Sequence, residues 1–245
     1  MIKSNYADDH ASPSRHQKLQ SKKKMPDTIE LPEQYEVYPS TKIVRGPKRA
    51  SYDRKLVHGI IDDALICHVG TVVNGRPSMI PTAHWRVGER IYIHGASKNR
   101  ILATIANGEE ACLCITHLDG LVMARSAFHH SANYRSVVIY GKGDIVADPE
   151  GKMEHSRLFV EKLSKGRWDQ IRHPSEQELK ATMFLGFDLN EVSAKVRSGD
   201  PVDDEEDYGL PVWAGVLPCN NVWGDPVADT RLDPAYSGPV AKAPE

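Results

Sequence analysis

The segment LICHVGTVVNGRPSMIPTAHW, Leu65–Trp85, contains the strongest structural signal in the chain. Apolar residues recur on both sides of Asn74-Gly75, a dipeptide that favours the two-residue turn of a β-hairpin. We therefore predict two antiparallel strands, 65–73 and 77–85, joined at this turn.

Further short strands follow the same pattern of apolar runs bounded by turn residues. A second hairpin is predicted across Asp119-Gly120, and two glycines, Gly141 and Gly143, predict a bulge or bend in a long strand. The additional predicted strands are 90–95, 110–117, 121–127, 136–148, 182–189, 192–199 and 211–218.

Helices are predicted at three places by capping residues and helical periodicity. Ser51 would cap a helix over 51–64, Ser97 one over 97–108, and Pro149 would begin one over 149–163. The apolar residues expected on one face of the first helix are Leu56, Ile60, Ile61 and Ala64.

The order of these elements indicates the fold class. These short strands, mostly in hairpin order, are interrupted by only three or four helices, so the strict strand–helix alternation of a parallel sheet is missing. We predict a mainly β (α+β) fold, in which a closed or nearly closed antiparallel barrel carries flanking helices, because closure removes exposed strand edges.

Composition and length set the domain organisation. The 245 residues carry a formal net charge of −2, which gives no general attraction to nucleic acid or membrane. We expect a disordered polar arm over 1–41, containing the basic run Lys22–Lys24, one domain over 42–218, and a tail over 219–245.

The chain has no membrane-spanning apolar run and no signal-peptide core, so we expect a soluble cytoplasmic protein. Its four cysteines are too few for a disulfide framework. Cys112 and Cys114 share one face of a strand and could suit a soft metal, but small core residues are the favoured interpretation, and no metal site is predicted.

Several familiar site motifs are missing. No glycine-rich nucleotide fingerprint opens a helix after a strand, no phosphate-binding P-loop is present, and the GKG at 141–143 lies inside a predicted strand. No catalytic triad is legible from spacing alone. Candidate binding or catalytic residues must therefore be identified from another pattern.

That pattern is a set of cationic strand ends. A strand ending at His94 leads into a helix start with Ser97, Lys98 and Arg100, which could hold a phosphate or could be an ordinary solvated helix start. Three such ends in a nearly neutral protein favour an anionic ligand. The other two ends are Tyr134, Arg135 and Ser136, and Lys195 with Arg197.

Five segments carry a resemblance to a known family. The segments IPTAHW, IYIHGASKNRIL, FHHSANYRSVVIYGKG and SAKVRSG, followed by DDEEDYGLPVWAGVLP, resemble the flavin-nucleotide-binding proteins of the pyridoxamine-phosphate-oxidase-like group. These are FMN-binding split barrels, and they include the 5-nitroimidazole-resistance (Nim) proteins. The resemblance covers about residues 42–217.

The resemblance implies a homodimer with FMN in each of two clefts between subunits. Ser97, Lys98 and Arg100 would hold the phosphate, and His94 would lie beside the ligand cavity and deliver protons. The strand residues implied to line the flavin are Ile80, Pro81, Thr82, Tyr134, Arg135, Ser136 and Val137. Those implied to close the site, some from the other subunit, are Lys195, Arg197 and Trp213.

Three functions fit these residues. The first is an FMN-dependent oxidoreductase that acts on a small planar substrate, such as a nitro compound. The second is a flavin or haem storage or sensing protein, with His94, His129 or His130 as a haem ligand. For His129 and His130 a solvated loop position is favoured. The third is an interaction domain without a cofactor.

Overall fold

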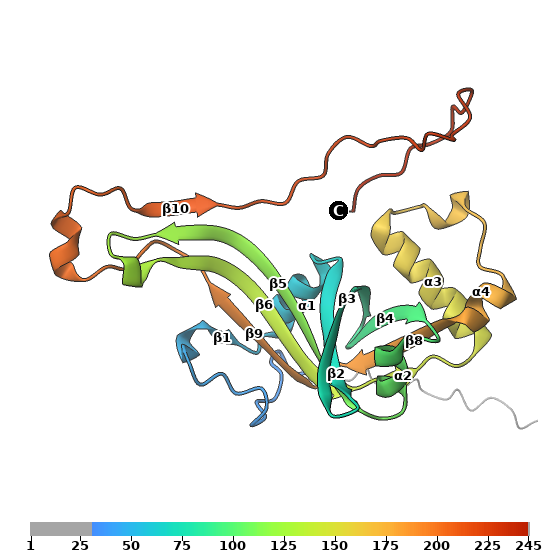
Figure 1. Cartoon of the computed structure of the whole chain (residues 1–245), viewed down its shortest axis with the longest axis horizontal. Coiled ribbons are helices and arrows are strands. Elements are labelled where there is room, and N and C mark those ends of the chain that lie inside the picture. Colours follow the sequence, from blue (N-terminus) through green and yellow to red (C-terminus); the bar gives the residue numbers. More distant parts are fainter. Residues whose placement is uncertain (1–30, 245) are drawn as a thin grey trace, which may run out of the picture. The chain divides into compact units, whose positions relative to one another are not determined.

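The computed structural model describes residues 31–244 (Figure 1). The chain divides into two units, Met1–Pro32 and Glu33–Glu245, and every element below belongs to the second. Lys22–Lys24 and most of the predicted N-terminal arm lie outside the described residues.

One antiparallel sheet dominates the described residues (Figure 1). Its ten strands run in the order β1-β9-β6-β5-β2-β3-β4-β8-β7, and β10 pairs with β5. The bounds are β1 Ala50–Ser51, β2 Ile66–Val73, β3 Arg76–Val87, β4 Arg90–Ala96, β5 Glu110–Met123, β6 Ser131–Lys142, β7 Asp144–Ile145, β8 Thr182–Asp188, β9 Glu191–Arg197 and β10 Gly215–Pro218.

The described chain also contains four α-helices and four short 3-10 helices. The prediction of a mainly β fold with three or four helices is confirmed. The α-helices are α1 Arg54–Asp62, α2 Arg100–Ala106, α3 Pro149–Leu163 and α4 Glu176–Ala181, and the 3-10 helices are η1 Pro47–Arg49, η2 Ala127–His129, η3 Trp168–Gln170 and η4 Glu205–Gly209.

The barrel closes where β6 continues into β7. β6 pairs with β5, whereas β7, which begins two residues after β6 ends, pairs with β8 at the other end of the strand order. Gly143 forms the corner between them, because a Cβ there would lie 2.9 Å from Ile105 Cγ2 and from the Phe187 ring. The two glycines therefore predicted the bend correctly, and Gly143 is the one that the packing requires.

The predicted hairpin between β2 and β3 is confirmed residue by residue. Val73 pairs with Arg76 across the turn. Asn74 has a φ of 50° and Gly75 a φ of 72°, the left-handed values that a type I′ turn needs. These strands bring Pro81 beside His68 and Thr82 beside Cys67.

The predicted hairpin across Asp119-Gly120 is wrong. β5 runs straight through these residues and only shifts register against β6 between Leu118 and Gly120. A Cβ on Gly120 would lie 2.9 Å from the Leu217 carbonyl oxygen of β10. The glycine therefore allows β10 to approach β5 closely, and it does not make a turn.

Two predicted helix caps are also wrong, by two residues each. Ser51 belongs to β1 and pairs with Ala194, so Asp53 caps α1 by accepting from the Leu56 N–H. The Ser97 N–H donates to the Ala181 carbonyl and extends the β4–β8 ladder, so Asn99 caps α2. Because strand pairing includes Ser51 and Ser97, both helices begin later in the chain than predicted.

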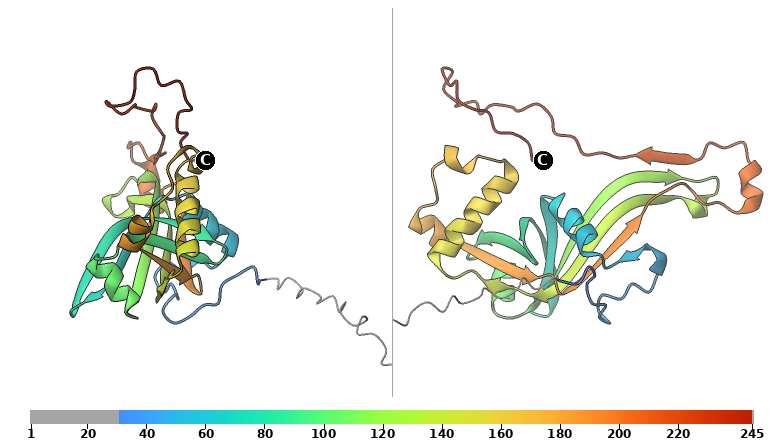
Figure 2. Two further views of the ribbon diagram at one scale, coloured as in Figure 1. Left: turned by 90° about the vertical axis from the view of Figure 1, so that its right-hand side faces the viewer. Right: turned by 180° about the vertical axis from the view of Figure 1, so that it is seen from behind.

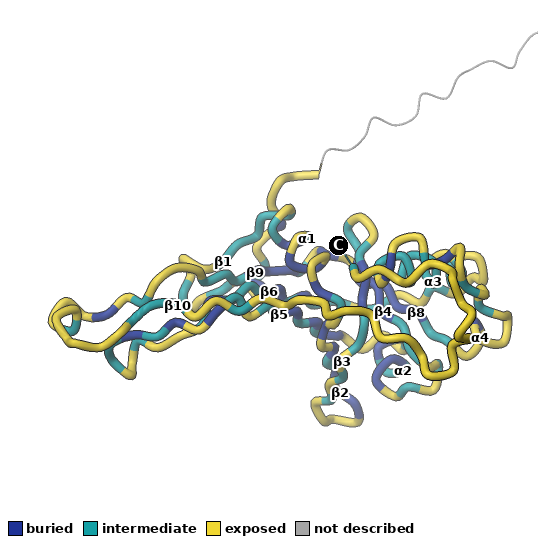
Figure 3. Tube along the Cα trace, turned by 90° about the horizontal axis from the view of Figure 1, so that it is seen from above, coloured by how far each residue is buried: buried dark blue, intermediate teal, exposed yellow. Residues whose placement is uncertain are grey.

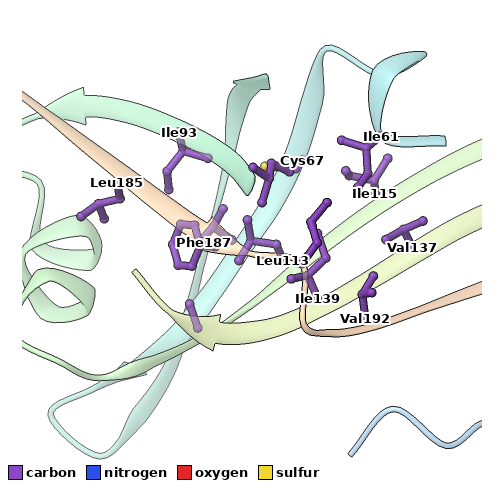
Figure 4. Packing of buried hydrophobic residues seen from close by; sticks show 14 of the residues in the cluster. Ile61, Cys67, Ile93, Leu113, Ile115, Val137, Ile139, Leu185, Phe187 and Val192 are labelled. Carbon is purple, nitrogen blue, oxygen red and sulfur yellow. The ribbon is translucent and has the colours of Figure 1, made fainter. Parts of the chain in front are cut away.

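The core fills the space between the sheet, α1 and α2. Figure 4 shows side chains from α1, β2, β4, β5, β6, β8 and β9 meeting there. Four of these core side chains have an exposed fraction of 0%: Ile61, Leu113, Ile139 and Phe187. In Figure 3 many buried stretches lie where these elements meet, further buried pieces lie along the β5–β6 hairpin, and the C-terminal segment is exposed.

The chain begins to pack before residue 42. Tyr35 is 4% exposed, and its hydroxyl donates to Glu89 at 2.8 Å and lies 2.8 Å from His58 Nε2. Residues 33–41, which the sequence analysis places in the arm, are therefore part of the packed unit.

The C-terminal segment after β10 has no helix or strand up to residue 244. It runs back from β10 toward α3, as the views in Figure 2 show, and the Lys242 N–H donates to Ser164 Oγ at 3.1 Å. None of the helices between residues 31 and 244 is long and apolar enough to cross a bilayer.

The last carbonyls of α1 are satisfied by side chains from other elements. His84 Nε2 lies 2.9 Å from the Ile61 oxygen and His117 Nε2 lies 2.9 Å from the Ile60 oxygen. His84 Nδ1 is buried without a partner. Burial therefore lowers the pKa of His84 to about 4.

We predict that Gly143→Ala destabilises the fold and Gly141→Ala does not. An added methyl at 143 meets Ile105 and Phe187, whereas at 141 no atom lies within 4 Å. Overpacking costs about 1–3 kcal/mol, so urea unfolding should show that loss for Gly143→Ala alone. Equal losses in both variants would contradict the packed corner.

His84 should make stability fall in acid. Its pKa is near 4 when folded and 6.5 when unfolded, so below pH 6.5 the unfolded chain binds the proton more tightly. Between pH 7 and pH 5 the wild type should lose about 2 kcal/mol more unfolding free energy than His84→Gln. Parallel pH profiles for the two proteins would refute this assignment.

Candidate functional site

The sheet has a solvent-facing side, which we call the outer face. It consists of the side chains of β2, β3, β5, β6 and β9 that alternate with the buried core residues. The register pairs Ser136 with Lys195, and Tyr134 with Arg197. Other members of the outer face are Ile66, His68, Val72, Met79, Pro81, Cys112, Cys114, Val138 and Tyr140.

Three of the predicted flavin contacts have side chains that point away from the outer face: Ile80, Thr82 and Val137. Ile80 packs against the core and Val137 is 0% exposed within it. Thr82 alternates with Pro81, and its Oγ1 lies 3.5 Å from the His94 carbonyl oxygen. On the outer face, a ligand would meet the side chains of Pro81, Tyr134 and Ser136 but only the backbone of Val137.

Arg135 is neutralised by two carboxylates. Its Nη1 donates to Asp63 at 2.8 Å and its Nε to Asp119 at 3.1 Å. These hydrogen bonds, the one to Asp119 first, raise the pKa of the Arg135 guanidinium. Because it alternates with Tyr134 and Ser136, Arg135 also lies on the opposite side of β6 from them.

The other predicted cations have no carboxylate partner within the described part of the chain. Lys195 Nζ donates to the Arg45 carbonyl at 3.0 Å, and Arg197 donates to the Asn133 side chain. Lys98 and Arg100 are exposed at the start of α2. These four side chains therefore keep their positive charge available to an anion.

Within one chain the structure does not bring these four cations together. Lys98 and Arg100 follow β4, Lys195 and Arg197 belong to β9, and four strands separate β4 from β9 in the sheet. At about 4.8 Å per strand the two pairs lie about 24 Å apart along the sheet. Trp213, which is 65% exposed, lies just before β10.

The backbone at the start of α2 is already satisfied. Asn99 Oδ1 accepts from the Ile101 N–H at 2.9 Å and from the Leu102 N–H at 3.2 Å. α2 is also only seven residues long. Anion binding there must therefore come from the side chains of Ser97, Lys98 and Arg100.

His94 lies among aromatic side chains between the sheet and α3. Its ring centroid is 4.5 Å from that of Phe159 and 5.6 Å from those of Phe184 and Trp85. Its Nδ1 is buried without a hydrogen-bond partner. Burial lowers the pKa of His94, so the ring is neutral at pH 7.

A cavity of about 330 Å³ opens beside His94. Its walls come from β4, β8, α3, α4 and the η3 loop. Arg172 lies on this wall and pairs with Glu178 at 2.7 Å. The lining residues are His94, Ser156, Phe159, Val160, Trp168, Ile171, Arg172, Pro174, Glu178, Leu179, Thr182 and Phe184.

His129 and His130 lie elsewhere, at the end of the β5–β6 hairpin. His129 Nε2 is 3.3 Å from an Asp204 oxygen and His130 Nδ1 is 2.9 Å from the Ser126 carbonyl. Asp203, which precedes Asp204 in the chain, accepts a hydrogen bond from the Arg125 guanidinium. Neither histidine lines the His94 cavity.

The cysteines are all unpaired. Cys112 and Cys114 share the outer face, as their spacing predicts, rather than the core. Within residues 31–244 no group of three or more histidine, cysteine or carboxylate side chains is arranged to hold a metal ion.

The sequence analysis identified His94 but missed the walls of its cavity. α4, which begins with a capping box at Ser175 and Glu178, and the η3 loop are not predicted, although the Ser-x-x-Glu spacing is a recognisable helix start. Phe159 lies within the predicted helix 149–163, but nothing local indicates that it faces His94.

Comparisons with family profiles and with solved structures agree on one family. A profile described as pyridoxamine 5′-phosphate oxidase matches residues 53–196. No curated protein sequence matches the chain.

Solved structures provide three informative neighbours. The flavocytochrome Anf3 from Azotobacter vinelandii is 39% identical, with 82% of this chain and 94% of that chain covered and a TM-score of 0.79. A FAD and haem binding protein from Mycobacterium smegmatis is 30% identical, with 78% and 94% covered and a TM-score of 0.75.

The third neighbour shares the fold alone. It is a protein assigned to 5-nitroimidazole antibiotic resistance in Bacteroides thetaiotaomicron, 17% identical, with 60% and 86% covered and a TM-score of 0.51. The predicted split-barrel fold is confirmed by these matches.

We predict that His94 titrates below an ordinary histidine. Its burial disfavours the charged ring and lowers its pKa, so at pH 6.5 its ¹⁵N chemical shifts should show less than half-protonation. In urea the same ring should titrate near the ordinary value of about 6.5, and His94→Gln identifies its signals. Half-protonation at pH 6.5 in the folded protein would contradict the buried position.

Proposed function

The chain belongs to the pyridoxamine 5′-phosphate oxidase family, and we propose that it is a redox protein that binds a flavin nucleotide and a haem. The observation that carries the proposal is a set of four cations without a carboxylate partner in the described chain. Two lie at the start of α2, Lys98 and Arg100, and two on the outer face, Lys195 and Arg197. Two relatives at or above 30% identity are named for a flavin together with a cytochrome or haem.

The flavin half rests on the side chains at the start of α2. Lys98 and Arg100 are exposed, have no carboxylate in the described chain, and follow Ser97. Charge-assisted hydrogen bonds from such groups suit a phosphate. FMN and FAD both carry a phosphate on the ribityl chain, so the same cations would serve either, although the sequence resemblance implies FMN.

The arrangement of the sheet favours a homodimer. Four strands separate Lys195 and Arg197 from the strand that precedes Lys98 and Arg100, so a second copy is the simplest source of both pairs at one ligand. The outer face also exposes apolar side chains, with Ile66 at 50%, Val72 at 52% and Met79 at 62%. Burying them against a second copy would stabilise the pair.

When bound, the flavin would supply the electron-transfer chemistry, and this chain would bind and orient it. Lys98 and Arg100 would hold the phosphate end, while Pro81, Tyr134 and Ser136 would contact the rest of the nucleotide. Aromatic residues pack around the His94 ring, and this ring can accept or donate a proton. The substrate expected from the sequence is a small planar electron acceptor, such as a nitro compound.

We predict that Arg100→Ala weakens flavin binding by about 10- to 100-fold, the equivalent of losing one hydrogen bond between charged groups. The measurement is flavin titration of the apoprotein by fluorescence, with FMN and FAD compared. Lys180→Ala, which removes an exposed cation on α4, serves as the control. Equal affinity in wild type and Arg100→Ala would remove the phosphate assignment.

Two further measurements identify the bound nucleotide and distinguish a redox enzyme from a storage protein. Acid release and chromatography of the chromophore identify FMN or FAD. Anaerobic reduction by a nicotinamide dinucleotide, followed by an electron acceptor, should reoxidise the bound flavin. A flavin that is reduced but never reoxidised by any acceptor would favour a storage protein.

A further inference from the structure

The side of the barrel under α3 has an apolar cluster of its own. Trp85, Tyr92 and Phe184 are buried there, and Phe159 of α3 packs against them. The cavity of about 330 Å³ continues this cluster between β4, β8, α3 and α4 (Figure 1). None of the residues assigned to the flavin nucleotide lines it, so the proposed function leaves this cavity without an occupant.

We propose that the cavity binds a small, neutral aromatic molecule, about the size of two fused rings. Its volume of about 330 Å³ lies at the lower end of the range of ligand pockets. It is about twice the volume of an apolar cavity that holds one benzene molecule. The inference goes beyond the proposed function, because neither the flavin rings nor the phosphate needs this space.

α3 covers this side of the sheet without filling the space beneath it. None of the 15 residues of the helix is fully buried, whereas a helix packed on a core usually buries an apolar stripe. Ser156, Phe159 and Val160 lie three or four residues apart on one helical face, and all three line the cavity. A ligand between α3 and β8 would complete the burial of Phe159 and Val160.

The polar groups of the wall favour a neutral ligand. The Ser156 hydroxyl donates to a backbone carbonyl of α3 at 2.8 Å, and the Thr182 hydroxyl donates to the Glu178 carbonyl at 2.9 Å. Arg172 and Glu178 pair with each other at 2.7 Å, so their charges cancel. A charged ligand would lose its hydration here without gaining a free counter-charge.

The rings of the wall are held in place by their neighbours. Trp168 stacks on His173, with 4.3 Å between ring centroids and an angle of 14° between the planes. The His94 ring lies 4.5 Å from that of Phe159 and 5.6 Å from that of Phe184. Such a preformed aromatic wall suits a flat ring system, which can pack against it in stacked or edge-to-face contacts.

The cavity adjoins the proposed phosphate site but does not overlap it. The Ser97 N–H donates to the Ala181 carbonyl at 2.8 Å, and Ala181 lies between Leu179 and Thr182, which belong to the cavity wall. The two sites share this backbone contact and no lining side chain. A flavin and the aromatic molecule can therefore be bound at the same time.

The test is isothermal titration calorimetry of the full chain at pH 7 with two probes. 2-Naphthol is neutral at this pH, and 2-naphthoate is an anion of similar shape. We expect 2-naphthol to bind with a Kd of about 10–100 µM and a negative heat-capacity change from apolar burial. 2-Naphthoate should bind at least tenfold more weakly, and equal or tighter binding of the anion would overturn the inference.

Val160→Phe tests the location. The added ring would occupy the cavity that Val160 lines, so 2-naphthol binding should weaken at least tenfold. The matched control is Val227→Phe, the same substitution at a side chain that is 95% exposed and does not line the cavity. Unchanged 2-naphthol binding in a Val160→Phe protein that circular dichroism shows to be folded would overturn the site.

The wild type provides a second readout, which remains decisive if Val160→Phe does not fold. Ring currents of bound 2-naphthol should shift the NMR signals of Phe159, Phe184 and the Trp168 indole. The indole of Trp223, which is 64% exposed in the C-terminal segment, should not shift. Shifts at Tyr134 in place of these wall residues would put the probe on the outer face and contradict the proposal.

Flavin titration separates this inference from the proposed function. Simultaneous binding of flavin and 2-naphthol supports both, whereas displacement of flavin by 2-naphthol would keep the flavin function and overturn the cavity as the binding site. A chain that binds 2-naphthol but no flavin would remove the proposed function and keep the cavity site. Wall signals that shift with protein concentration, without any 2-naphthol binding, would show that a second copy fills the cavity and would overturn the inference.

Discussion

The closure of the barrel at Gly143 is the constraint on which the rest of the structure depends. One continuous run of chain pairs with β5 as β6 and with β8 as β7, so the last strand of the order is joined covalently to the third strand. No side chain fits in this corner, because Ile105 and Phe187 occupy the space. Once closed, the barrel has a packed interior and two different exteriors, one open and one covered by α3.

These two exteriors divide the chemistry. The open outer face offers apolar and cationic side chains over five strands, which suits an extended ligand or a second copy. The covered side, under α3 and α4, offers a small apolar cavity with one neutral histidine, which suits an enclosed ligand. Both meet at the end of β4, where His94 and Lys98 are four residues apart.

Charge pairing decides which cations can take part. Arg135 resembles Arg197 in sequence context, since each lies in a strand next to a polar residue. Asp119 and Asp63 nevertheless neutralise Arg135, whereas Arg197 meets only the Asn133 amide and backbone carbonyls. Those partners come from β5 and from the end of α1, which no local pattern relates to β6. Local sequence therefore identified cationic strand ends but could not separate the structural ones from the available ones.

The sequence by itself determined the antiparallel β class, the hairpin at Asn74-Gly75, the helix from Pro149 and the candidate status of His94. Each of these depends on turn chemistry, capping or periodicity within a few residues. Only the tertiary structure decided that Gly120 accommodates β10, that Asn99 caps α2 in place of Ser97, and that Phe159, Phe184 and Arg172 form a cavity around His94. These features arise from pairings between segments distant in sequence, where strand register and side-chain packing override local preference.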